Sequence, residues 1–167
     1  MSVWRGVTGL SSVWRKAAVA AACVLLVGAV AGCGGGEGVA QDATVTAYVE
    51  ASLCAGAKQE LASQGGRAGE LRVQAACLPN ARSQAKLNLA TLGANARRAT
   101  EDSTTVAYLE ASDPAGARFT HPILETAEVP WIAGSSGQAA MAHLLKLVEA
   151  SGSGSLRQSL REELHES

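Results

Sequence analysis

The sequence predicts an α/β domain in which helices cover both faces of a four-stranded parallel sheet. Segments rich in β-branched residues alternate four times with segments of helical periodicity, and the connections between them are short. This alternation favours right-handed βαβ crossovers, which place successive strands in one parallel sheet. A repeat marks two of the strands: residues 44–58 (TVTAYVEASLCAGAK) and 104–118 (TTVAYLEASDPAGAR) are identical at nine of fifteen positions.

The expected strands are rich in Val, Thr, Tyr and Ile and end at residues that favour turns. They span residues 44–51, 71–79, 104–111 and 129–134. The expected helices carry apolar side chains at helical spacing. They span 53–64, 81–98 with Asn80 as N-cap, 114–128 with a kink or break at Pro122, 137–151 and 156–166.

Each copy of the repeat is expected to contain a strand, the turn at its carboxyl end and the first turn of the next helix. Gly56 and Gly116 would then let helix and strand backbones approach closely, because glycine has no side chain. In open α/β sheets, ligands bind at the carboxyl ends of strands and near helix N-termini. The repeat therefore marks two turns on the edge where a ligand would bind.

The first 32 residues have the character of a targeting segment. Three basic residues precede an apolar stretch of fourteen residues (17–30), which is shorter than the roughly 20 residues that span a bilayer. Its length suits a secretory signal peptide. Residues 30–33 (VAGC) resemble the lipobox of bacterial lipoproteins, which implies cleavage before Cys33 and attachment of fatty acids such as palmitate to that residue. The alternative is an ordinary secretory signal with Cys33 near the cut.

The predicted organisation has four parts. Residues 1–32 form the signal peptide, 33–43 the lipidated cysteine and a Gly-rich tether, 44–150 one α/β lobe, and 151–167 a linker and short helix. Cleavage removes three of the 14 basic residues and none of the 15 acidic ones, which leaves a formal charge of −4. We therefore expect the acyl chains to hold the protein at the extracytoplasmic face of a membrane, in the periplasm or at the cell surface, with no nucleic-acid partner.

Two cysteines remain in the exported domain. Cys54 and Cys77 are expected to form a disulfide, since paired cysteines are common in oxidising compartments. The alternative is two unrelated small apolar residues. The bridge would close a loop of some two dozen residues and stabilise the domain by about 3 kcal/mol.

Residues 100–137 (TEDSTTVAYLEASDPAGARFTHPILETAEVPWIAGSSG) resemble the type 1 periplasmic-binding fold. The likeness is to the first lobe of the substrate-binding lipoproteins of branched-chain amino-acid ABC transporters, and it extends over about residues 44–150. It implies a flavodoxin-like strand order of 2-1-3-4 and a single lobe, because the second lobe of the family is missing. Glu110 stands where the family has Gly, and Pro114 stands where its turn has Ser.

The resemblance implies a function in solute binding, with the ligand-facing residues in two turns. These residues are Ser112, Asp113, Ala115, Ser135 and Ser136. Helix amides and hydroxyls suit a carboxylate, and the carboxylate of Asp113 suits an ammonium group. The alternative for the four polar side chains is helix capping. A binding function would make the chain a membrane-anchored relative of an amino-acid-binding protein with weak or partner-dependent affinity.

A second function class stays open, namely a degenerate lobe that binds a protein such as an ABC permease, or itself, and no small molecule. Enzyme activity is not expected, because the sequence contains no Gly-x-Ser-x-Gly elbow and no phosphate-binding loop. No metal site or cofactor is expected either, since the three histidines lack the spacing of metal ligands.

Overall fold

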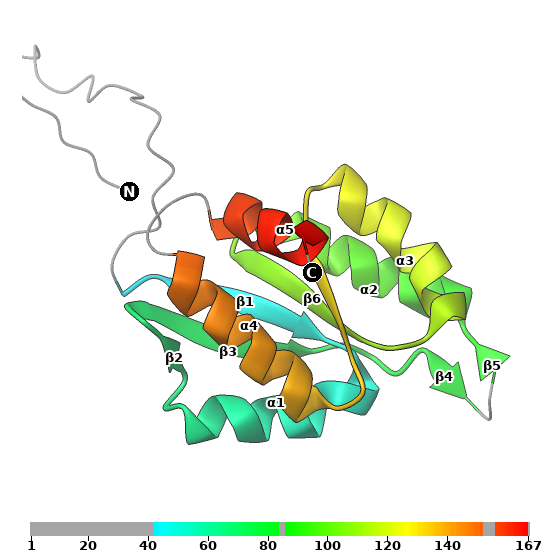
Figure 1. Ribbon diagram of the computed structural model, residues 1–167. Helices are drawn as coiled ribbons and strands as arrows, with labels where there is room; N and C mark the ends of the chain where they lie inside the picture. Colours follow the sequence, from blue (N-terminus) through cyan, green and yellow to red (C-terminus); the bar gives the residue numbers. More distant parts are fainter. Residues whose placement is uncertain (1–41, 84–85, 152–155, 167) are drawn as a thin grey trace, which may run out of the picture. The chain divides into compact units, whose positions relative to one another are not determined.

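The sheet is mixed and has five strands within residues 42–83, 86–151 and 156–166, the part of the chain that the computed structural model describes (Figure 1). Its order is β2 (Arg67–Ala68), β3 (Leu71–Cys77), β1 (Thr44–Val49), β6 (Thr105–Ala111) and β7 (Trp131–Gly134). The last four strands are parallel, and β2 pairs antiparallel with β3. The α/β class is confirmed. The prediction of a four-stranded, all-parallel sheet is wrong, although the parallel strands follow the order 2-1-3-4.

The additional strand β2 forms because glycines allow a tight reversal of the chain. Gly65, Gly66 and Gly69 have φ angles of 68°, 72° and 56°, which side chains disfavour. The segment Arg67–Ala68 between them is only two residues long and pairs with the start of β3. The sequence indicates the turn but not this pairing.

Helices cover both faces of the sheet, as predicted. On one face lie α1 (Ala51–Ser63), α4 (Gly137–Ser151) and α5 (Leu156–Glu166), which share one apolar core with the inward side chains of β1 and β6. On the other face α2 (Leu89–Glu101) and α3 (Pro114–Thr126) pack together over Tyr48 and Tyr108 (Figure 1). Much of this core is Ala, Val and Leu, so the buried apolar area per residue is modest.

The helix predicted over residues 81–98 is wrong in its first half. A small hairpin occupies this stretch, formed by β4 (Arg82–Ser83) and β5 (Lys86–Leu87). The side chain of Asn80 accepts a hydrogen bond from the Arg82 amide at 2.9 Å, which makes a local turn and no helix cap. Asn88 is the N-cap of α2 instead, because its side chain accepts from the Thr91 amide at 3.1 Å.

Two further boundaries differ from the prediction. Helix α3 ends at Thr126 and not at 128; it continues through Pro122, so the predicted break is absent, while a kink there stays a prediction. Strand β7 begins at Trp131 and not at 129, because the preceding Glu128 has a φ of 56° and turns the chain.

The sequence indicated that the repeated glycines, Gly56 and Gly116, let a helix and a strand approach closely. The structure shows different contacts at both glycines. A Cβ on Gly56 would lie 3.3 Å from the Cα of Gly137, so this glycine allows α1 to approach α4. A Cβ on Gly116 would meet the carboxylate of Asp113, the N-cap of its own helix, at 3.1 Å. Gly56 therefore serves a contact between two helices, and Gly116 a contact within its own helix cap.

The C-terminal helix is part of the packed domain. Leu156 and Leu160 are buried in the core of the first face. The Arg157 side chain donates hydrogen bonds to the carbonyl oxygens of Thr105, Asp102 and Ser103 at 2.5, 3.2 and 3.1 Å. These bonds attach α5 to the start of β6.

The predicted signal peptide, the lipidation residue Cys33 and the tether up to residue 41 lie outside the described residues. Among the helices that the structure does describe, none combines the length and apolar character needed to cross a bilayer.

Candidate functional site

The two copies of the repeat end side by side. β1 and β6 are neighbouring parallel strands with Tyr48 opposite Tyr108 and Val49 opposite Leu109. This register places Glu50 and Glu110, the next residues in each copy, at the same carboxyl edge. Along the chain, β3 is added on one side of β1, whereas β6 and β7 are added on the other side. Such a switch point between neighbouring strands is where open α/β sheets bind ligands.

Glu50 occupies an unfavourable position for a charge at this edge. Its Oε2 atom accepts a hydrogen bond from the Ala111 amide at 2.9 Å. Burial raises the pKa of its carboxyl above the usual value, the Ala111 amide opposes that shift, and the nearby Glu110 reinforces it. A carboxyl group whose environment disfavours its charge is a candidate for a functional role.

Asp113 and Arg82 meet across the same edge. The Asp113 carboxylate caps α3 by accepting from the amides of Ala115 and Gly116 at 3.2 and 3.1 Å. It also forms an ion pair with the guanidinium of Arg82, which reaches over from the β4–β5 hairpin. Both side chains are partly exposed, so solvent can reach the pair.

A small cavity lies beneath this ion pair. Its volume is about 30 Å³, and its lining includes Glu50, Ser52, Asn80, Arg82, Asn95 and Asp113. Buried Asn95 is already occupied, since it donates to the Pro79 carbonyl at 2.9 Å. A space of this volume holds roughly one or two water molecules. The cavity as it stands is too small for an amino acid.

Glu110 belongs to a separate cluster on the α3 side. Its side chain is 4% exposed and accepts from the Thr120 hydroxyl at 3.2 Å, while Nε2 of His121 lies 2.5 Å from its Oε1. The His121 ring stacks on Trp131 with the ring centroids 4.2 Å apart. The buried carboxylate is thus satisfied by its neighbours. This cluster ties β6 and β7 to α3.

The repeated tyrosines differ in their bonding. Tyr48 donates to Asp102 at 3.0 Å. The hydroxyl of Tyr108 is buried and has no hydrogen-bond partner within the described residues, and burial raises its pKa. Both rings fill the core between the sheet and α2–α3. The repeat therefore conserves a strand-and-turn geometry and not an identical set of contacts.

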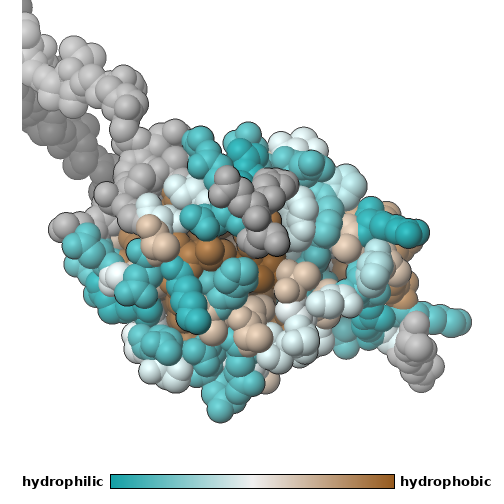
Figure 2. Space-filling model, in the orientation of Figure 1, coloured by the Kyte–Doolittle hydropathy of each residue, from teal (hydrophilic) through white to brown (hydrophobic). Residues whose placement is uncertain are grey.

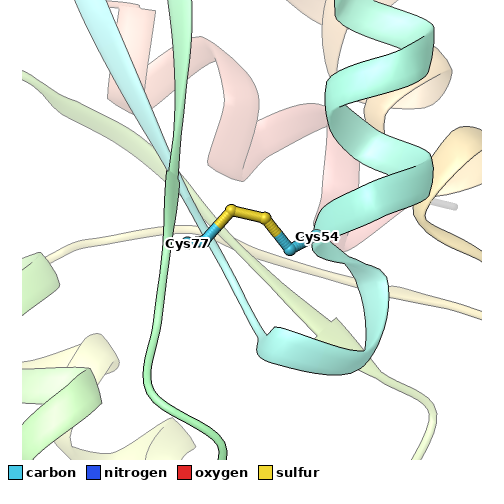
Figure 3. Close-up of a disulfide and its surroundings, with 2 residues drawn as sticks. All are labelled: Cys54 and Cys77. Carbon is cyan, nitrogen blue, oxygen red and sulfur yellow. A yellow bond between two sulfur atoms is a disulfide. The ribbon is translucent and has the colours of Figure 1, made fainter.

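The disulfide lies at the same edge. Cys54 in the first turn of α1 and Cys77 at the end of β3 are bridged, and their Cα atoms are 5.6 Å apart, within the usual range for a disulfide (Figure 3). The bridge joins the two chain segments that continue into the cavity lining, 50–52 and 79–82. It therefore links two of the chain segments that line the cavity.

The predicted ligand-facing residues do not converge. Asp113 lines the cavity, whereas Ser112 and Ala115 are exposed beside it and do not. Ser135 and Ser136 follow β7, away from the cavity lining, and the Ser136 hydroxyl accepts from the Ala139 amide at 3.2 Å at the start of α4. For Asp113 and Ser136, helix capping is the observed contact.

Sequence reasoning missed Glu50, Arg82 and Asn95. The repeat was a signal for Glu50, because it aligns Glu50 with Glu110 at the strand ends. No sequence pattern pointed to Arg82 or Asn95 as site residues, since the segment that forms the hairpin around Arg82 was expected to be helix. Over residues 42–83, 86–151 and 156–166, no group of three or more His, Cys, Asp or Glu side chains is arranged to hold a metal ion.

Comparison of the chain with protein families, with curated proteins and with solved structures finds no match.

Proposed function

We propose that this protein is an extracytoplasmic lipoprotein whose α/β domain binds a small amine-bearing solute, such as an amino acid, weakly and without catalysis. We further propose that the domain is a single lobe of the type 1 periplasmic-binding fold. The observation that carries the proposal is the convergence of Glu50, Asp113 and Arg82 on one cavity at the switch point. A cofactor has no role in this proposal.

The chemistry of these three side chains suits a zwitterion. Arg82 offers paired donors to a carboxylate, and Glu50 and Asp113 offer acceptors to an ammonium group. A bound solute would replace the Arg82–Asp113 pair, since both groups would then have a new partner of opposite charge. One wall supplies only a few such bonds, so we expect a Kd on the order of 1 mM.

Titration of the protein with the common amino acids by calorimetry tests this proposal. Glu50→Gln should weaken binding about tenfold, because it removes one charge-assisted bond.

The same substitution should raise the melting temperature at pH 7. Folded Glu50 has a raised pKa, so it favours folding at low pH and opposes folding as pH rises through its titration. Lower affinity together with higher stability would separate a ligand contact from a structural one.

The matched control is Glu125→Gln, which removes an exposed carboxylate from α3 at a residue outside the cavity lining. Its affinity should equal that of the parent. Heat release that Glu50→Gln leaves unchanged would contradict the assignment of the site.

The membrane anchor is proposed from the lipobox-like residues 30–33. Cells that express the protein should incorporate radioactive fatty acid into it, and Cys33→Ala should abolish the label. Cys54→Ala serves as the control, because this cysteine lies in the disulfide and should leave labelling intact. Equal labelling of the Cys33→Ala variant would rule out this anchor.

A second candidate function is a protein-interaction module, and the small volume of the cavity favours it. In this alternative the Arg82–Asp113 pair stays closed and the carboxyl edge docks on a permease or on a second copy of the chain. No heat with any amino acid, together with a concentration-dependent dimer in sedimentation, would favour this alternative.

A further inference from the structure

A second and larger cavity lies along β7, the edge strand of the sheet. Its volume is about 200 Å³, its lining comes from Pro130, β7, α4 and α5, and it is open to solvent. The lining residues are Pro130, Trp131, Ile132, Ala133, His143, Arg161 and Leu164. Figure 2 shows apolar surface between α4 and α5 on this face. None of these residues lines the cavity at the switch point.

The floor of this cavity is apolar. Ile132 is 3% exposed, and Pro130 is among the most deeply buried side chains. The indole ring of Trp131 is held in place by its stack on His121. An aromatic residue next to aliphatic residues along the same strand suits a flat or branched apolar group.

The polar residues that line the cavity are Arg161 and His143. Arg161 supplies a permanent positive charge and His143 an imidazole, while no acidic side chain of the described residues lines the cavity. Arg161 lies 3.4 Å from Glu128, but that carboxylate is 71% exposed and so forms only a weak, screened pair. The guanidinium therefore keeps donors that an incoming anion can use.

We infer that this cavity binds a small organic anion, namely a carboxylate with an aromatic or branched aliphatic body. Its apolar part would lie against Trp131 and Ile132, and its carboxylate would pair with Arg161. The volume is below the roughly 300–1,000 Å³ typical of pockets for drug-sized ligands, which favours a ligand with a single ring. This site is independent of the proposed function, because it shares no lining residue with the switch-point cavity.

Trp131 makes the inference directly measurable. The chain contains three tryptophans, and the other two, Trp4 and Trp14, precede the described domain. In the full chain with Trp4→Phe and Trp14→Phe, fluorescence reports on Trp131 alone. Phenylacetate should give a saturable change in fluorescence. Phenethylamine, which has a similar body and the opposite charge, should give none at the same concentrations.

Arg161→Gln should weaken phenylacetate binding at least tenfold, because it removes a charge-assisted pair. Arg161→Lys keeps the charge but loses the paired donors, so its affinity for phenylacetate should lie between that of the parent and that of Arg161→Gln. Arg118→Gln removes an exposed arginine from α3 and is the matched control, with affinity unchanged. A linear response to phenylacetate, an equal response to phenethylamine, or unchanged affinity in Arg161→Gln would each overturn the inference.

Discussion

Replacement of Gly137 by alanine is expected to lower the free energy of unfolding by about 3 kcal/mol or more. A Cβ at this position would overlap the carbonyl oxygen of Leu53 and lie 2.6 Å from the amide nitrogen of Ala57. Both are backbone atoms of α1 and cannot rotate away. Helices α1 and α4 would have to separate, which disturbs the core beneath them. Urea denaturation followed by circular dichroism measures the loss.

Gly93→Ala is the control for this experiment, since it is the same substitution in another helix. Its Cβ would meet Cε1 of Phe119 at 3.3 Å, and that side chain is 40% exposed and can move. Alanine also stabilises a helix interior by up to about 1 kcal/mol relative to glycine. We expect Gly93→Ala to be neutral or stabilising. If Gly137→Ala stayed within about 0.5 kcal/mol of the parent, the close approach of α1 and α4 would be wrong.

Removal of the disulfide is expected to cost about 3 kcal/mol. Cys54 and Cys77 are separated by 23 positions, so the bridge restricts a substantial loop of the unfolded chain. The effect is a large share of the stability of a small domain with an Ala-rich core. The double variant Cys54→Ser/Cys77→Ser should therefore unfold at a lower urea concentration than the parent.

The parent treated with a thiol reductant is the companion measurement. It should match the double variant, because both lack the same covalent link, and it should run more slowly on a denaturing gel than the untreated parent. A loss below about 1 kcal/mol in both samples would mean that the unfolded chain gains little freedom without the bridge.

Much of the fold was predictable because the elements are locally encoded. The strand around Tyr48 is rich in β-branched residues, and α4 presents a continuous apolar stripe. The elements that were missed are two-residue strands, whose pairing depends on neighbours and not on their own composition. The competition between Asn80 and Asn88 as N-cap has the same origin, since both can cap a helix and only the hairpin between them decides.

The candidate site was less predictable than the fold. Asp113 could be placed at a helix start from its sequence neighbours, whereas its partner Arg82 depends on the unforeseen hairpin. Likewise, Glu110 was visible as a departure from the family pattern, but its pairing with His121 is set by how α3 lies on β6. Contacts between side chains of different elements need the packed structure.

The central claim is that a solute binds at the carboxyl ends of the two repeated strands, and NMR on ¹⁵N-labelled protein tests it most directly. An equimolar mixture of the common amino acids should shift the amide signals of Ala111, Asp113 and Gly116, which surround the carboxylates of Glu50 and Asp113. Amides of the distant β2–β3 turn, such as Gly69, should stay in place. Shifts that are absent at the strand ends, or that are spread evenly over the domain, would contradict the claim.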